Sequence, residues 1–111
     1  MSLFFAYKNR GISKDITILD GNGNTITPGA SDKVRATIKR EGQTAVLTVN
    51  SDAPTANGSS FTKGASNRLR LDASDLNFAE GTYSLIIDYY DNDDTQEWKT
   101  VDRQVFVLEG E

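Results

Sequence analysis

The sequence predicts an all-β fold, an antiparallel β-sandwich of about seven short strands. Apolar and polar residues alternate over residues 33–39, and apolar residues occupy every second position over residues 83–89, which is the period of a half-buried strand. Nowhere do apolar residues recur with the spacing of an amphipathic helix over a useful span. Clusters rich in Gly, Asn, Asp and Ser separate the alternating segments and favour turns. Charged outward faces further favour antiparallel sheets with one face exposed to solvent.

The expected strands each combine apolar alternation with a flanking turn signal, and they cover residues 15–20, 33–41, 44–50, 68–73, 82–91 and 97–108. The expected core consists of their inward-facing side chains: Ile16, Ile18, Val34, Ala36, Ile38, Leu47, Val49, Leu69, Leu71, Tyr83, Leu85, Ile87, Val105 and Val107. Residues 21–24 and 42–43 are predicted turns. Residues 74–80 are expected to form a single helical turn, with Leu76 or Phe78 closing one end of the core.

The last third of the chain predicts one long β-hairpin. Tyr83, Leu85, Ile87 and Tyr89 occupy every second position and should share one face of its first strand. The polar tip 91–94 favours a chain reversal.

Length and composition indicate a single domain, because 111 residues lie near the common domain size. Residues 1–11 form an N-terminal segment rich in aromatics, and residues 50–66 form a long polar loop. Loops of this length are often functional. Two interpretations stay open for it: a mobile connection anchored by Phe61, or a contact surface for a neighbouring subunit.

The chain contains no cysteine and no histidine. Disulfides, thiol nucleophiles, histidine-based triads and zinc sites with Cys or His ligands are therefore impossible within it. No nucleophile motif is present, so we expect neither catalytic residues nor a cofactor, and the protein is not expected to be an enzyme. The net charge of −4 disfavours nucleic acid and anionic membranes as partners.

Two acidic clusters carry oxygen ligands at alternate positions, a spacing seen in calcium loops. Both depart from the EF-hand pattern, and Asp and Asn also favour hairpin tips. We therefore expect ordinary turns and no metal site, with calcium binding as the alternative that stays open for the second cluster. The two clusters are Asp20, Asn22 and Asn24, and Asp91, Asp93, Thr95 and Glu97.

The expected mode of action is contact with other proteins. A small domain without disulfides gains limited stability from its core, and homo-oligomerisation is one common further source of stability. Apolar side chains at a terminus also favour contact, unless that segment packs on its own sandwich. The candidate interface residues are Leu3, Phe4, Phe5, Tyr7, Phe61 and Trp98. For Trp98, Tyr89 and Tyr90 we expect a role in the core or on a sheet face. A carbohydrate or protein contact is the alternative, since amphipathic rings serve both purposes.

The order of these signals resembles the Ig-like domains of phage tail and baseplate proteins, including the N-terminal domain of the siphophage upper baseplate protein. Residues 16–26 resemble the opening strand, Asp-Gly turn and short strand of that family, and residues 33–39 its next strand. Residues 69–75, the Gly81-Thr82-Tyr83 start of a long strand and the Val-rich run 105–107 complete the resemblance, which covers about residues 12–108.

The resemblance implies an Ig-like β-sandwich without catalytic residues that acts as a structural protein of the virion. Such a domain packs against copies of itself or other tail subunits, and it reaches the virion by assembly in the host cytoplasm. The Asp-rich tip 91–94 departs from the family pattern. Because Gly-Thr-Tyr also begins strands in bacterial surface modules, the alternative is a carbohydrate-binding or adhesive Ig-like module of a bacterial surface protein.

Overall fold

A computed structural model describes residues 2–19, 22–26, 29, 31–51, 59–63, 69–73, 76–91 and 97–110. These residues contain strands and no helix. The strands are β1 (Ser2–Tyr7), β2 (Ile12–Ile16), β3 (Lys33–Lys39), β4 (Leu47–Asn50), β5 (Ser60–Lys63), β6 (Leu69–Ala73), β7 (Gly81–Tyr90) and β8 (Trp98–Glu109).

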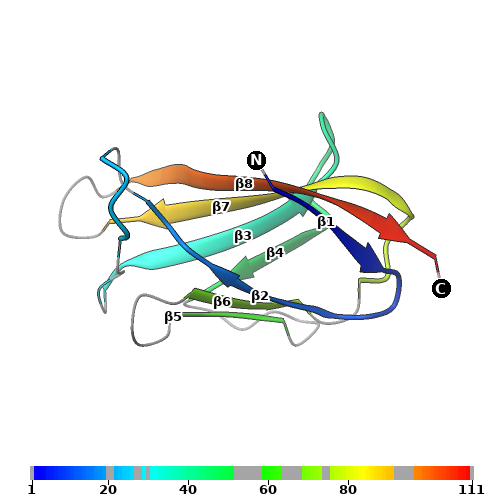
Figure 1. The fold of residues 1–111 in the computed structure, drawn as a ribbon, viewed down its shortest axis with the longest axis horizontal. Helices are drawn as coiled ribbons and strands as arrows, with labels where there is room; N and C mark the ends of the chain where they lie inside the picture. The colour runs from blue at the N-terminus through cyan, green and yellow to red at the C-terminus, as the bar shows by residue number, and fades with distance from the viewer. Residues whose placement is uncertain are drawn as a thin grey trace.

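The strands form two sheets (Figure 1). The larger sheet has the order β1-β8-β7-β3-β4. It is mixed, because β1 pairs with β8 in parallel, whereas the pairs β8–β7, β7–β3 and β3–β4 are antiparallel. The smaller sheet has the order β2-β6-β5 and is antiparallel. Figure 1 shows the smaller sheet along one side of the larger one, with β5 in contact with β3 and β4. The all-β prediction is confirmed, whereas a purely antiparallel arrangement is not.

The alternating segments of the sequence form the centre of the larger sheet. On β3, Val34, Ala36 and Ile38 are buried while the residues between them are half-buried. Their partners on β7 are Tyr89, Ile87 and Leu85, all buried as well. The inward face predicted for each of these two strands is therefore confirmed, because the side-chain period of two places every second residue in the core.

The chain turns a corner directly before β7, and a hydrogen bond from a tyrosine side chain stabilises this corner. The Tyr83 hydroxyl donates a hydrogen bond to the carbonyl oxygen of Ala79, four residues upstream. Nη2 of Arg40 donates to the carbonyl oxygens of Ala79 and Glu80, and the guanidinium carbon of Arg40 lies 5.0 Å from the centre of the Tyr83 ring. Gly81 has a φ of 141°, and a Cβ at this position would lie 2.6 Å from Nη2 of Arg40. The positive φ thus favours glycine at this corner, and any larger residue would also have to displace the Arg40 guanidinium.

The face predicted for β8 is wrong. Val105 and Val107 are half-buried on the side away from the smaller sheet, whereas Gln104, Phe106 and Leu108 are buried. Phe106 lies between two other rings, 5.0 Å from Phe4 and 5.6 Å from Tyr83 between centroids. A phenylalanine ring removes more apolar surface from water than a valine side chain, so this register is the more stable one. An irregularity between Ile87 and Asp88 also shifts the β7–β8 register, so a single alternation does not extend along β8.

Other boundaries differ more modestly. β1 and β5 were not among the expected strands, and β5 lies within the predicted loop 50–66. β2 ends at Ile16 rather than continuing to residue 20. Ile18 is nevertheless buried, and its carbonyl oxygen accepts a hydrogen bond from the Ile26 amide at 2.8 Å, so the chain does reverse between them. Residues 76–80 form no helical turn, although Leu76 is buried as expected. The tip 92–94, loop residues 52–58 and 64–66, and the side chains of Leu69 and Leu71 lie outside the described residues.

Candidate interaction surface

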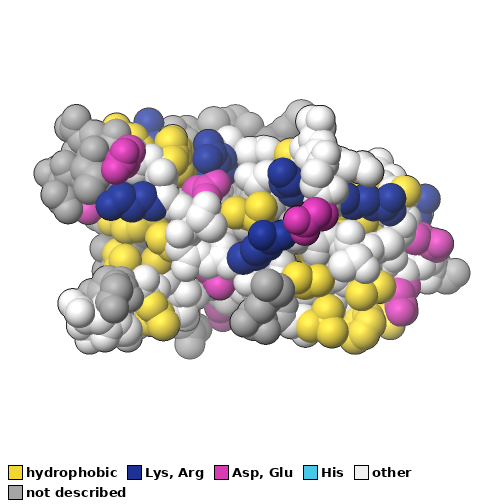
Figure 2. All heavy atoms as spheres, turned by 90° about the horizontal axis from the view of Figure 1, so that it is seen from above, with side chains coloured by type: hydrophobic (Ala, Val, Ile, Leu, Met, Phe, Trp, Pro, Cys, Tyr) yellow, Lys and Arg dark blue, Asp and Glu magenta, His cyan; other side chains and the backbone are white. Residues whose placement is uncertain are grey.

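β1 presents three large apolar side chains to solvent. Leu3, Phe5 and Tyr7 are 62%, 59% and 50% exposed, and they occupy alternate positions, so they lie on one face of the strand. We call these three residues the outer patch. Figure 2 shows hydrophobic side chains gathered at the end of the molecule where β1 lies, beside charged side chains. Of the six candidate interface residues, the structure brings these three together.

The neighbouring strand continues the outer patch with smaller side chains. Leu3 pairs with Val105 and Phe5 pairs with Val107, and both valines are half-buried. Arg103, two residues before Val105, donates from Nη2 to the Ser84 hydroxyl at 3.1 Å and to Glu41 Oε2 at 3.4 Å. An apolar surface with a polar, charged margin of this kind is typical of protein interaction sites.

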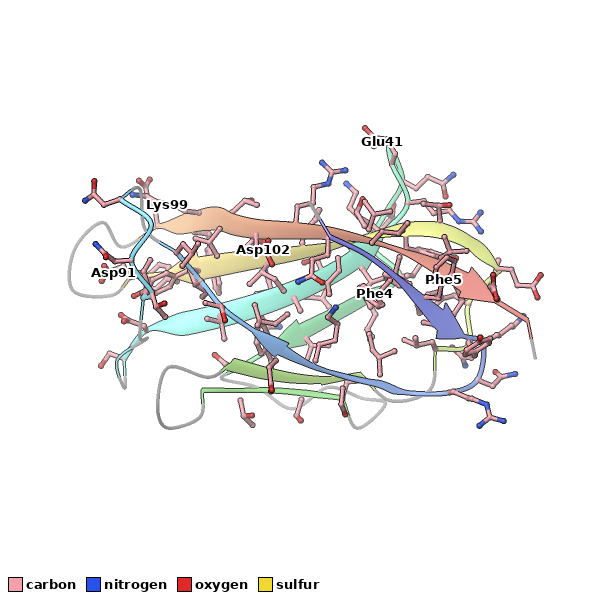
Figure 3. The ribbon with its side chains drawn as sticks, viewed as in Figure 1. Phe4, Phe5, Glu41, Asp91, Lys99 and Asp102 are labelled. Carbon is pink, nitrogen blue, oxygen red and sulfur yellow. The ribbon has the colours of Figure 1, made fainter. Side chains whose placement is uncertain are left out.

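Two of the aromatics proposed for the interface face inward: Phe61 belongs to the core, and Phe4 packs against it. Phe61 lies on β5 and is 2% exposed, so the prediction that it contacts a partner is wrong. Phe4 is partly buried against the core and stacks on Phe106, because its position on β1 faces inward while Phe5 faces outward (Figure 3). Phe4 and Phe5 differ in burial because neighbouring residues of a strand point to opposite faces.

Trp98, the remaining candidate, belongs to a separate cluster at the opposite end of β8. Lys33, Arg35, Tyr90 and Trp98 form what we call the aromatic–cation strip. The ring centroids of Tyr90 and Trp98 lie 5.5 Å apart. The guanidinium carbon of Arg35 lies 4.2 Å from the Trp98 ring centre, and Nζ of Lys33 lies 5.5 Å from that of Tyr90. Trp98 is 36% exposed, so the strip is accessible although Arg35 lies against its indole.

A buried carboxylate holds the strip in place. Asp88 accepts hydrogen bonds from Nε and Nη2 of Arg35 at 3.3 and 3.0 Å and from the Thr100 hydroxyl at 2.8 Å. Charge-assisted bonds of this kind orient a guanidinium more strongly than neutral ones. The sequence alone does not indicate that Arg35, Asp88 and Thr100 are neighbours, because only the cross-strand register brings them together.

Tyr89 does not belong to an exposed aromatic group. It is buried, and its hydroxyl donates to Oδ2 of Asp32 at 2.8 Å. The same oxygen accepts the Gly29 amide at 2.8 Å. Tyr89 therefore anchors the chain before β3 instead of facing solvent, and a carbohydrate contact at this end would depend on Trp98 and Tyr90.

A polar group also lies on the inner side of β8. Gln104 donates from Nε2 to Oδ2 of Asp102 at 3.0 Å, and its Oε1 is buried without a hydrogen-bond partner among the described residues. Nζ of Lys14, on β2, lies 3.8 Å from the centre of the Phe4 ring. Burial lowers the pKa of Lys14 below its ordinary 10.5, and the charge of Asp102 opposes that shift.

Within the part of the chain that the structure describes, no three acidic side chains gather into a group suited to a metal ion. Asp20, Asp93 and Thr95 of the two calcium candidates lie outside the described residues. The described residues also contain no helix long and apolar enough to cross a membrane. No protein-family model, curated protein or solved structure matches the chain.

Proposed function

We propose that this chain is an Ig-like domain with a structural role in a phage tail or baseplate, where it makes protein–protein contacts as a homo-oligomer and with other virion subunits. The observation that carries the contact role is the outer patch, three large apolar side chains held in fixed positions by a paired strand. The absence of cysteine and histidine supports a non-catalytic role. The virion assignment rests on the resemblance of residues 12–108, and assembly would take place in the host cytoplasm.

The strand order supports an Ig-like β-sandwich. In variable-type Ig domains one sheet contains strands G, F, C and C′ and the other contains B, E and D. The orders β8-β7-β3-β4 and β2-β6-β5 correspond to these sets when β2 is taken as strand B. The Tyr83 hydroxyl bond to Ala79 corresponds to the tyrosine corner at the start of strand F.

Covering the outer patch contributes favourable free energy to association. The exposed part of Phe5, 59% of the roughly 150–250 Å² that an aromatic side chain can bury, contributes about 2–4 kcal/mol when covered. Leu3 and Tyr7 have similar exposed fractions. Together these side chains contribute toward the cost of association, which is about 4–15 kcal/mol.

Sedimentation velocity over a concentration series tests the contact role. We expect the wild type to self-associate and Phe5→Ser to weaken that association about tenfold or more, equivalent to about 1.4 kcal/mol. Val46→Ser is the matched control, since Val46 is 45% exposed and lies in the β3–β4 connection, and it should leave association unchanged. A wild type that stays monomeric at high concentration contradicts self-association. The virion assignment is tested separately, by identifying the chain in purified particles and by the genes that flank its own.

A carbohydrate-binding or adhesive module of a bacterial surface protein is the second candidate. It is favoured by one observation, the partly exposed Trp98 beside Tyr90 on the outer face of the sheet. A glycan array with the wild type and Trp98→Ala tests it. Specific binding that disappears in the variant would favour this module over the virion role.

A further inference from the structure

β1 is attached to the rest of the domain through a limited set of contacts. It forms the edge of the larger sheet and, among the described strands, pairs with β8 alone. A link of four residues, 8–11, then carries the chain from β1 to β2, which belongs to the other sheet. β1 can therefore leave the domain without breaking the pairing between any two of the other described strands.

The link contains a backbone conformation that most residues avoid. Asn9 has a φ of 66° and is the one non-glycine residue with positive φ in the described ranges. Asparagine tolerates this region better than other non-glycine residues, yet the conformation remains less favourable than an extended one. Its amide donates to the Leu76 carbonyl oxygen at 2.9 Å, and the Lys8 amide donates to that of Glu109 at 2.7 Å. Backbone hydrogen bonds of Asn9 and Lys8 thus maintain the bend, although Asn9 has a less favourable backbone conformation.

The inward side chains of β1 cover apolar side chains of β8. Phe4 stacks on Phe106 at 5.0 Å, and Ala6 is 3% exposed. Removal of β1 would uncover Phe106 and Leu108, the partners of these two residues. Any second copy of the chain carries a β1 with the same side chains, so it can restore these contacts in the same register.

We propose that β1 is exchanged between two copies of this chain, giving a strand-swapped dimer in which residues 8–11 act as the hinge. This inference rests on the proposed self-association and specifies its geometry. The closed and exchanged forms share their β1–β8 contacts, so the balance between them depends on the hinge and on protein concentration. An extended hinge relieves the conformation of Asn9, and strained short hinges favour exchange. Four residues span at most about 13–14 Å, so the two domains meet near their β1–β2 links.

Engineered disulfides can detect the exchange, because the chain has no cysteine of its own. Ala6 and Leu108 are paired and buried, so a dimer that merely packs outer patch against outer patch cannot join them between chains. The two single variants Ala6→Cys and Leu108→Cys are refolded together and oxidised. We expect a covalent heterodimer on non-reducing gels. Peptide mass spectrometry should show the disulfide joining the β1 peptide of the first variant to the β8 peptide of the second.

The double variant Ser84→Cys/Val105→Cys is the matched control. These paired residues lie on β7 and β8, neither of which exchanges, so the disulfide should form within one chain. If the wild type dimerises but the double variant Ala6→Cys/Leu108→Cys cross-links only within a chain, strand exchange is overturned and the proposed self-association stands. If the wild type is monomeric, both are overturned.

A hinge variant keeps the test decisive should the cysteine substitutions prevent folding. Glycine adopts positive φ without strain, so Asn9→Gly should stabilise the closed form and lower the dimer association constant roughly fivefold or more. Phe5→Ser reports on the outer patch in parallel. A dimer that is insensitive to Asn9→Gly but weakened by Phe5→Ser would contradict exchange and support packing through the outer patch.

Discussion

The corner before β7 allows a quantitative prediction for Tyr83→Phe. The substitution removes only the hydroxyl, which donates to the Ala79 carbonyl oxygen. The ring contacts with Phe78 and Phe106, at 4.9 and 5.6 Å between centroids, remain. Ala79 is exposed and its oxygen also accepts Nη2 of Arg40 at 3.4 Å, so the acceptor is not left without a partner. The expected cost is therefore that of one net hydrogen bond, about 0.5–1.5 kcal/mol.

Urea denaturation followed by circular dichroism measures this cost. Tyr90→Phe is the matched control, because the Tyr90 hydroxyl makes no hydrogen bond among the described residues, and its expected effect is near zero. Tyr83→Ala should cost about 3–5 kcal/mol, since it also removes a buried ring. Equal stability of Tyr83→Phe and Tyr90→Phe would refute the role assigned to the corner bond, and so would a loss from Tyr83→Phe as large as that from Tyr83→Ala.

Three further predictions concern the core, the corner glycine and the buried lysine. Leu85→Ala should lower the free energy of unfolding by about 2–5 kcal/mol in the same denaturation assay, because Leu85 is fully buried; an unchanged urea midpoint would contradict its core position. Gly81→Ala should cost about 1–3 kcal/mol, through positive φ and displacement of the Arg40 guanidinium, and a variant as stable as the wild type would contradict both causes. Burial lowers the pKa of Lys14 in the folded chain, so the unfolded chain binds that proton more tightly. The free energy of unfolding of the wild type, relative to that of Lys14→Met, should therefore rise as the pH approaches 10.5. Parallel plots of unfolding free energy against pH for the two proteins would contradict this.

The sequence predicted the buried residues correctly where apolar and polar residues alternate strictly along a strand. Val34, Ala36 and Ile38 alternate with charged or polar residues, so the inward face of β3 is unambiguous. β8 is different, because four apolar residues follow one another directly from Val105 to Leu108. An uninterrupted apolar run carries no periodicity, so its inward face is set by the tertiary contacts of Phe106.

The candidate surface was predictable in part for a similar reason. The N-terminal aromatics were recognisable as a cluster, but the division between Phe4 inside and Phe5 outside depends on β1 pairing with β8, at the other end of the chain. Parallel pairing of the two terminal strands leaves no local turn signal in the sequence. The Arg35–Asp88–Thr100 network was missed because it joins three strands at positions fixed by register alone.

The parallel pairing of β1 with β8 also has a mechanical consequence. β1 begins at Ser2, which is paired with Gln104, and β8 leaves the pairing at Glu109 beside Tyr7. A load applied through both ends of the domain therefore pulls the two strands along their length in opposite directions. All the hydrogen bonds between them then resist together in shear instead of opening one after another. A domain joined to its neighbours through both ends would transmit tension across this strand pair before the rest of the fold is stretched.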